Sequence, residues 1–255
     1  MAWMLRGILP KFISAVTFYT CLPVPSHWPQ DFRGIAQFAP WVGLGLGLGL
    51  GLLDWGLQGL HLPLLARSGL LVGAGLRLTG GLHLDGAMDT ADGLAVMDPD
   101  RRLTVMADSR TGAFGAMVAV MILVLKILAL SSLPTGRPMI LALTLGWARW
   151  GQLWAIAAYP YLKAQGKGAF HKEAIQSRWQ TVPNLLLLIA LGGFLSVFHP
   201  AQSRLALGLT IAGPLTAYLT GAWLQHKLGG QTGDTYGAIV EWTEALLFCV
   251  ATALG

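Results

Sequence analysis

Charged residues are scarce in this chain of 255 residues. Asp, Glu, Lys and Arg make up 11% of it, apolar residues make up 54%, and the mean hydropathy is +0.58. A soluble domain carries about 25% charged residues, so this chain lacks the charge needed to cover a water-facing surface. The shortage argues against a soluble globular protein and predicts an integral-membrane protein.

Cysteine is rare, with two residues, and basic patches and a signal-peptide core are missing. Cys21 and Cys249 lie far apart in apolar sequence, which predicts two buried free thiols. No basic stretch is interleaved with aromatic residues, which argues against nucleic acid as a partner. Lys11 and several prolines break the apolar segment 8–24, and no small-residue cleavage site follows it. This segment therefore predicts an interfacial or re-entrant helix rather than a cleaved signal peptide.

Apolar runs of membrane-spanning length fill most of the remaining sequence. A helix needs roughly 20 residues to cross a bilayer. Such runs occur near 35–57, 62–80, 112–133, 138–158, 183–198, 205–224 and 237–255. The glycines of run 43–51 recur four residues apart, a pattern that favours close helix packing. The sequence thus predicts an all-α fold, a polytopic membrane helix bundle of about seven transmembrane helices plus the N-terminal helix, in a single domain over 1–255.

Basic residues alternate between rich and poor segments. The poor loops hold one each, Arg67, Arg137 and Arg204. The rich segments hold Arg6, Lys11 and Arg33, then Arg77, Arg101, Arg102 and Arg110, then Lys163, Lys167, Lys172 and Arg178. By the positive-inside rule the rich segments face the cytosol, with the N-terminus inside and the C-terminus outside.

The acidic residues gather on the same predicted side. Six of the twelve Asp and Glu residues fall between Asp85 and Asp108, in a predicted cytosolic loop. Three more, Asp234, Glu241 and Glu244, lie in or just after another inner loop. Acidic residues contribute little to orientation, so topology does not explain the cluster. The clustering indicates a site at the cytosolic face.

The first acidic motif has helical spacing. Asp85, Asp89 and Asp92 stand at positions i, i+4 and i+7, on one face of a helix, where their charges repel. A cation relieves the repulsion, and hard carboxylate oxygens suit Mg²⁺ or Mn²⁺. A solvated polar face or an acidic helix cap is the alternative. We favour the metal because acids at membrane depth are costly and usually functional.

Two neighbouring features have two interpretations each. Asp108 and Arg110 precede an apolar run and are either a fourth ligand with a phosphate-binding arginine, or an interfacial anchor with a helix cap. His83 either ligates metal or hydrogen-bonds within the fold, and we favour a functional role.

A glycine-rich loop, 229–234, precedes further acids. Its glycines let backbone N–H groups approach an anion. Glu241 and Glu244 enter an apolar helix, where unpaired carboxylates are avoided. Arg149, inside a predicted span, is an ion-pair partner for one of them or part of the site, and the two interpretations weigh equally. Lys126 is expected to pair with an acid. Carboxylates, arginines and glycines together favour metal-assisted phosphoryl or nucleotidyl transfer.

Several segments resemble the cobalamin synthase family, the adenosylcobinamide-GDP ribazoletransferases. The longest is 80–93, Gly-Gly-Leu-His-Leu-Asp-Gly-Ala-Met-Asp-Thr-Ala-Asp-Gly. Further matching segments are 17–25, 106–115, 166–170 and 229–238, the last followed by Glu241 and Glu244. They span essentially the whole chain in order.

The resemblance implies the last assembly step of coenzyme B12 synthesis. Adenosylcobinamide-GDP would be joined to α-ribazole, or to its 5′-phosphate, with release of GMP and dependence on Mg²⁺. It also implies a bacterial cytoplasmic (inner) membrane protein, contact with the lipid bilayer, an active site facing the cytosol, and room for a homo-oligomer.

The residue roles expected from motif and resemblance fall into three sets. The metal ligands are Asp85, Asp89, Asp92 and Asp108. The catalytic candidates are Asp92, Asp108 and His83, with Asp108 as a ligand or as the base that accepts the hydroxyl proton. The phosphate- and substrate-binding residues are Arg110, Arg149, Gly229, Gly230, Thr232, Gly233 and Asp234.

Two alternative functions would require sequence patterns that differ from the one in this chain. A CDP-alcohol phosphotransferase also carries spaced aspartates, but its Asp-Gly is followed by Ala-Arg, whereas Asp85-Gly86 leads to Asp89-Thr90. A transporter would place its carboxylates near the bilayer midplane on broken helices, and the cytosolic cluster disfavours that.

Overall fold

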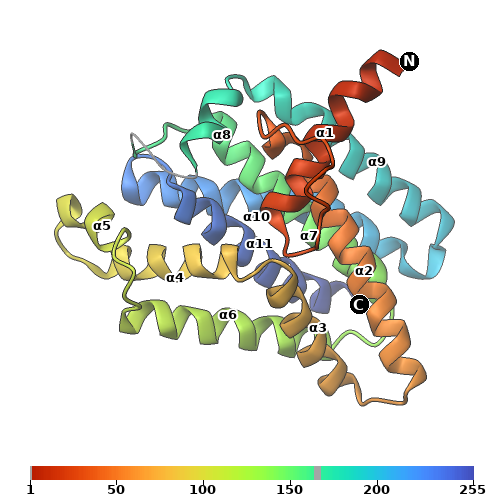
Figure 1. The fold of residues 1–255 in the computed structure, drawn as a ribbon. Coiled ribbons are helices and arrows are strands. Elements are labelled where there is room, and N and C mark those ends of the chain that lie inside the picture. The colour runs from red at the N-terminus through yellow and green to blue at the C-terminus, as the bar shows by residue number, and fades with distance from the viewer. Residues whose placement is uncertain (1, 164–167) are drawn as a thin grey trace.

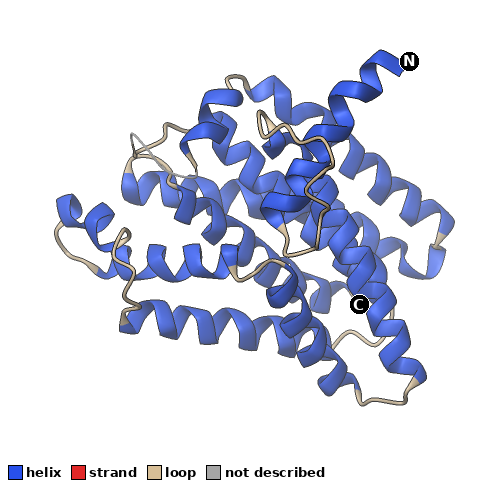
Figure 2. Ribbon diagram, in the orientation of Figure 1, coloured by secondary structure: helices blue, strands red, loops and turns tan. Residues whose placement is uncertain are grey.

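The computed structural model describes residues 2–163 and 168–255, and these form helices joined by short loops (Figures 1 and 2). The α-helices are α1 (Ala2–Tyr19), α2 (Ala39–Gly59), α3 (Leu64–Leu78), α4 (Leu82–Ala95), α5 (Pro99–Val105), α6 (Ala113–Ser131), α7 (Arg137–Ala158), α8 (Ala169–Ala174), α9 (Val182–Phe198), α10 (Ser203–Leu228) and α11 (Gly233–Leu254). Three short 3₁₀ helices cover Ile35–Phe38, Arg178–Thr181 and Pro200–Gln202. The predicted all-α bundle is confirmed.

Among the described residues, five helical segments are long and apolar enough to cross a membrane. They are Ile35–Gly59, Ala113–Ser131, Arg178–Phe198, Pro200–Leu228 and Gly233–Leu254. The predicted span 62–80 is the 15-residue helix α3, and the predicted span 138–158 is the 22-residue helix α7. The apolar part of α1, Gly7–Tyr19, is shorter than a crossing. A polytopic membrane protein is confirmed, and the count of seven spans stays a prediction.

Helix α7 forms the centre of the bundle. It is buried along nearly its whole length and packs against α2, α9, α10 and α11. The close contact with α2 depends on Gly43, Gly47 and Gly51, which face α7, whereas Gly45 and Gly49 face open space. The sequence prediction of glycine-mediated packing is therefore confirmed for one face of α2.

Enlarging one of the packed glycines should destabilise the bundle. A Cβ atom at Gly47 would lie 2.5 Å from Ala142 Cα and 2.5 Å from Leu141 O, both backbone atoms of α7. We expect Gly47→Ala to lower the free energy of unfolding by about 1–3 kcal/mol, as overpacked sites do. Gly49→Ala is the matched control, because nothing lies within 4 Å of its Cβ position. Equal midpoints of thermal unfolding in detergent for the two variants would contradict this account.

Helices α3 and α4 follow one another along α6 (Figure 1). Between them Gly80 and Gly81 have φ of +61° and +73°, a left-handed backbone that favours glycine. Helix α4 packs against both α6 and α11. The helical spacing of the acidic motif is confirmed, but its placement in a loop is corrected: α4 is part of the bundle, because Gly86 allows close packing against Asp234 of α11.

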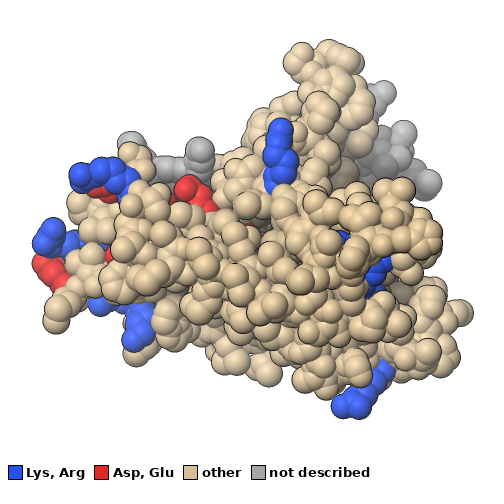
Figure 3. All heavy atoms as spheres, turned by 90° about the horizontal axis from the view of Figure 1, so that it is seen from below, with Lys and Arg blue, Asp and Glu red and all other residues tan. Residues whose placement is uncertain are grey.

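Some charged residues lie at the surface, and others form buried ion pairs. In Figure 3 most charged side chains of the visible face gather at the end of the molecule that carries α5, and the rest of that face is largely uncharged. The C-terminal ends of α4, α7 and α10 lie toward that end, and those of α2, α6 and α9 lie toward the other (Figure 1). This separation is what the predicted orientation requires, and the side that faces the cytosol stays a prediction.

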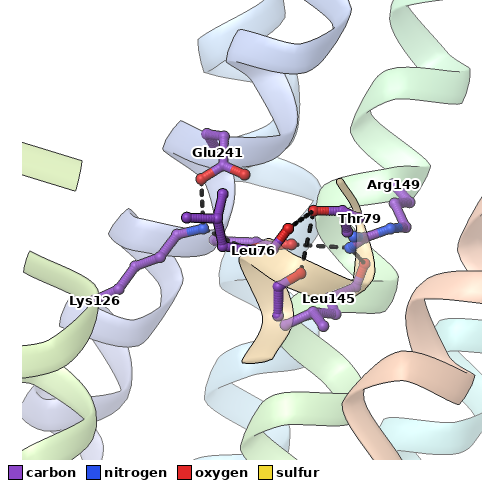
Figure 4. Close-up of polar contacts among 8 residues, drawn as sticks. Leu76, Thr79, Lys126, Leu145, Arg149 and Glu241 are labelled. Atoms are coloured by element: carbon purple, nitrogen blue, oxygen red, sulfur yellow. Dashed lines mark hydrogen bonds and ion pairs between the residues drawn. The ribbon is translucent and has the colours of Figure 1, made fainter. Parts of the chain in front are cut away.

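One buried ion-pair cluster confirms two sequence interpretations. The Lys126 ammonium bonds Glu241 and Glu244, at 2.6 Å each, and the Arg149 guanidinium bonds Glu244 at 2.8 Å. Figure 4 shows Lys126 extending from α6 to Glu241 on α11, with Arg149 on the neighbouring α7. This pairing accounts for Arg149 without a substrate, and a substrate-binding role for it stays a prediction.

The two cysteines are free, but they are less buried than predicted. Cys21 is exposed and Cys249 is partly exposed. Cys21 follows the end of α1 in a loop, where its backbone N–H donates to Leu78 O. The apolar sequence around it is therefore not packed around its thiol.

Candidate active site

A cavity of about 180 Å³ lies where five helices meet. Its lining comes from α1, α4, α7, α8 and α11, with Gly168 at the start of α8 beside them. The polar lining residues are His83, Asp85, Gln152, His171, Asp234 and Tyr236. Two predicted catalytic or ligand residues and the glycine-rich loop therefore border one space.

The mouth of the cavity is acidic. Asp85, exposed on α4, and Asp234, in the first turn of α11, line the cavity, whereas Asp89, half-buried one turn after Asp85, is not among its lining residues. The two helices touch here, because a Cβ at Gly86 would lie 2.6 Å from the Asp234 carbonyl oxygen. The Asp234 carboxylate accepts hydrogen bonds from the Lys163 ammonium at 2.8 Å and from the Thr232 hydroxyl at 3.2 Å. We call Asp85, Asp89 and Asp234 the acidic rim.

Burial and neighbouring like charges raise the pKa of Asp89 in the acidic rim. Burial, followed by the charges of Asp85 and Asp234, raises the pKa of Asp89 to about 6. A carboxyl with this pKa is partly protonated near neutral pH unless a cation neutralises its neighbours. Carboxylate oxygens that repel one another are a donor set that suits a hard divalent ion. Within 2–163 and 168–255, no three His, Cys, Asp or Glu side chains are grouped closely enough to hold an ion by themselves.

Asp92, the third residue of the motif, caps a helix. Its two carboxylate oxygens accept hydrogen bonds from the backbone N–H groups of Gly112 and Gly115, both at 2.8 Å. These donors lie at the start of α6, where a negative charge also favours the helix dipole. The acidic-cap alternative therefore applies to Asp92, although the helix it caps is α6 and not its own. Its metal role stays a prediction.

Asp108 and Arg110 form a surface pair. The Arg110 guanidinium donates to the Asp108 carboxylate at 2.7 Å, and the Arg110 side chain is 87% exposed. Hydrogen bonds from Arg110 lower the pKa of Asp108 to about 2. A carboxylate with so low a pKa is a weak proton acceptor at neutral pH. Neither residue lines the cavity, and their predicted roles as ligand, base and phosphate contact stay predictions.

Aromatic rings and two histidines form the inner wall. Tyr19 lies parallel to the imidazoles of His83 and His171, with ring centroids 6.3 Å and 6.0 Å away. The Tyr19 hydroxyl is 3.5 Å from His171 Nε2. Burial lowers the pKa of His83 to about 3 and that of His171 to about 4. These lowered pKa values favour neutral imidazoles at physiological pH, and the catalytic role of His83 stays a prediction.

The glycine-rich loop is shaped mainly by the helices it joins. Gly229 ends α10 with a left-handed φ of +79°, and Gly230 packs against Leu162 and Pro160. Thr232 caps α11 by accepting a hydrogen bond from the Thr235 N–H. Only Gly233 and Asp234 of this loop border the cavity, at the positive end of α11.

Comparison with known proteins decides the family. The family model described as cobalamin-5-phosphate synthase matches residues 11–252. The chain belongs to the cobalamin-5-phosphate synthase family. The predicted family is confirmed, and so is the prediction that the chain is an enzyme. The CDP-alcohol phosphotransferase and transporter alternatives are set aside.

Several relatives of this cobalamin-5-phosphate synthase family member are named adenosylcobinamide-GDP ribazoletransferase. One from Trichormus variabilis is 52% identical over 251 residues, which cover 98% of this chain and 100% of the relative. One from a Synechococcus species is 53% identical over 245 residues, 96% and 97% of the two chains. One from Prochlorococcus marinus is 39% identical over 255 residues, 96% of each. No solved structure matches the chain.

Four polar or aromatic cavity residues of this cobalamin-5-phosphate synthase family member are not predicted from sequence. Gln152 and Tyr236 lie within apolar helices, and His171 and Phe18 lie on α8 and α1. A polar Gln152 in the middle of an apolar helix was the one available signal. Lys163 pairs with Asp234 of the acidic rim, but in the sequence it indicates only the orientation of the chain in the membrane. The motif residue Lys167 and its neighbours 164–166 lie outside the described residues.

Proposed function

We propose that this enzyme joins adenosylcobinamide-GDP to α-ribazole, or to α-ribazole 5′-phosphate, and releases GMP in a Mg²⁺-dependent reaction. One observation carries the proposal: α4 and α11 bring an acidic rim to a cavity in a chain 52% identical to a ribazoletransferase over nearly its full length. Carboxylates at the mouth of a cavity suit a metal-bound diphosphate.

The Mg²⁺ ion is assigned to Asp85 and Asp89. Magnesium in phosphoryl-transfer sites is usually held by one or two carboxylates, with substrate phosphates and water completing the octahedron. Two adjacent carboxylates on one helix face therefore suffice, and no third protein ligand is required. Once bound, the ion would neutralise charge on the diphosphate and on the departing phosphate.

Positive groups beside the rim bind and orient the diphosphate. Lys163 carries a positive charge to the mouth, and the start of α11 contributes the positive end of its dipole. A ribose hydroxyl of α-ribazole attacks the phosphorus that bears the cobinamide arm. The bond from that phosphorus to the GMP oxygen breaks, and the hydroxyl proton passes to solvent at the open mouth. Positioning and charge stabilisation supply the acceleration.

We also propose where the enzyme lies in the cell and which side of the membrane its acidic rim faces. The enzyme is placed in the bacterial cytoplasmic membrane, with the acidic rim facing the cytosol, where the basic-rich loops are expected. The lipid bilayer is its immediate partner, and a homo-oligomer is compatible with the fold.

The purified enzyme in detergent tests the function directly. We expect GMP release from adenosylcobinamide-GDP only when α-ribazole or its phosphate is present, loss of turnover with EDTA, and recovery with added Mg²⁺. GMP release without an acceptor would indicate a hydrolase instead. Full turnover after exhaustive chelation would show that the reaction does not require a metal.

The raised pKa of Asp89 predicts a pH dependence of Mg²⁺ binding. Because the pKa is about 6, Asp89 is protonated below that pH and loses its charge toward the ion. The apparent affinity for Mg²⁺ should fall by about tenfold for each pH unit below 6. Excess Mg²⁺ should move the acidic limb of the rate profile to lower pH, since the ion binds the deprotonated form. If the acidic limb of the rate profile does not change with the Mg²⁺ concentration, the assignment of Asp89 as a Mg²⁺ ligand is wrong.

A further inference from the structure

The inner wall of the cavity carries buried polar atoms with no hydrogen-bond partner among the described residues. They are His83 Nδ1, His83 Nε2, His171 Nδ1, Gln152 Oε1 and Tyr236 Oη. The four side chains are 1–4% exposed. A buried polar atom without a partner costs free energy, so such atoms are rare unless a ligand or water satisfies them.

These atoms converge on one space. They come from four separate helices, α4, α7, α8 and α11, and all four residues line the same cavity. Thr144 is also buried on α7 without a partner, but it does not line this cavity. Convergence of unpaired atoms from separate elements is the arrangement of a ligand-binding wall.

We propose that this inner wall binds the guanine base of the nucleotide half of the substrate, with the Gln152 carboxamide pairing the edge of the base. The inference rests on the proposed function and names the subsite for its leaving nucleotide. The cavity, at about 180 Å³, is smaller than the ~300–1,000 Å³ that hold whole drug-sized ligands. It therefore takes one small end of the substrate, and the corrin macrocycle stays outside.

The chemistry of the wall favours guanine over the benzimidazole of the acceptor substrate. The benzimidazole of a ribazole has one nitrogen bonded to ribose and offers a single acceptor. Guanine offers N–H donors and O and N acceptors along its edges. Neutral imidazoles, a carboxamide and a phenol each provide a donor and an acceptor, which matches the mixed edge of a purine. The Phe18 ring on the cavity wall adds an aromatic surface for the base.

This placement also orients the reaction. With guanine on the inner wall, the diphosphate reaches outward to the acidic rim, and the cobinamide arm projects beyond it. The GMP oxygen that leaves then points inward. An in-line attack requires the incoming hydroxyl to approach from the opposite, open side, where a second large substrate has access.

The test measures binding of GMP and of ribose 5-phosphate, which lacks the base, to the purified enzyme by calorimetry. Wild-type enzyme should bind GMP at least tenfold more tightly than ribose 5-phosphate. Gln152→Leu should weaken GMP binding by about tenfold to a hundredfold, because the paired edge loses its partner, and leave ribose 5-phosphate unchanged. Thr144→Val, on the same helix but outside the cavity, should change neither affinity.

Several outcomes would overturn the subsite. They are equal wild-type affinities for the two probes, unchanged GMP binding in Gln152→Leu, or a raised KM for α-ribazole with GMP binding intact. Gln152→Met, which keeps the side-chain length, replaces the leucine variant if that variant unfolds. The wild-type comparison decides the question if both unfold. Failure of the proposed function is distinguishable, because it appears as wild-type enzyme that forms no product.

Discussion

The Asp89→Asn variant is expected to lose about a hundredfold to a thousandfold in kcat/KM at saturating Mg²⁺. Asparagine keeps the shape of the side chain but removes the charge that we propose holds the ion. A bound metal supplies several kcal/mol of transition-state stabilisation, and each 1.36 kcal/mol corresponds to about tenfold in rate. Initial rates of GMP release over a range of Mg²⁺ concentrations measure the loss.

Two further variants make this result specific. Asp100→Asn removes an exposed carboxylate from the nearby helix α5 and should leave the rate unchanged. Asp92→Ala removes the cap of α6 and should cost about 1 kcal/mol of stability while the Mg²⁺ dependence persists. Wild-type turnover by Asp89→Asn would contradict the assignment of the metal to Asp89. Loss of Mg²⁺ dependence in Asp92→Ala alone would assign the metal to Asp92 instead.

The Lys126→Met variant is expected to lose about 3–5 kcal/mol of stability. Lys126 is buried in α6 and neutralises both Glu241 and Glu244 on α11. Methionine fills a similar volume but leaves two carboxylates at membrane depth with only Arg149 to balance them. Thermal unfolding in detergent measures the change.

A second substitution should rescue part of this loss. Lys126→Met with Glu241→Gln removes one of the uncompensated charges and should unfold at a higher temperature than Lys126→Met alone. Lys227→Met, at an exposed position on α10, is the matched control and should match the wild type. Wild-type stability in Lys126→Met would refute the role of the cluster.

The sequence predicted those parts of the fold that depend on local pattern. Apolar runs located the long helices, and the four-residue glycine repeat located the face of α2 that meets α7. The spacing of the acidic motif placed Asp85 and Asp89 on one helix face. Glu241, Glu244 and Arg149 were expected to pair because isolated charges are unfavourable in an apolar helix. All of these depend on residues near one another in sequence or on charge alone.

The rest required knowledge of long-range contacts. Asp92 has the spacing of a metal ligand, but its partners Gly112 and Gly115 lie some twenty residues away at the start of another helix. His171 reaches the cavity only because α8 packs beside α1. Gln152 faces the cavity because of the rotation of α7 within the bundle. No periodicity in one segment reports such rotations or docking positions.

The attachments at the two ends of α4 have a consequence for the energetics of binding. The left-handed glycines at 80 and 81 set the direction of its first turn, and the Asp92 hydrogen bonds hold its other end to α6. These contacts restrain the helix from sliding along or rotating about its own axis, so we expect the carboxylates between its ends to be preorganised. Substrate association then loses little entropy in ordering the site, and more of the interaction energy is available to stabilise the transition state.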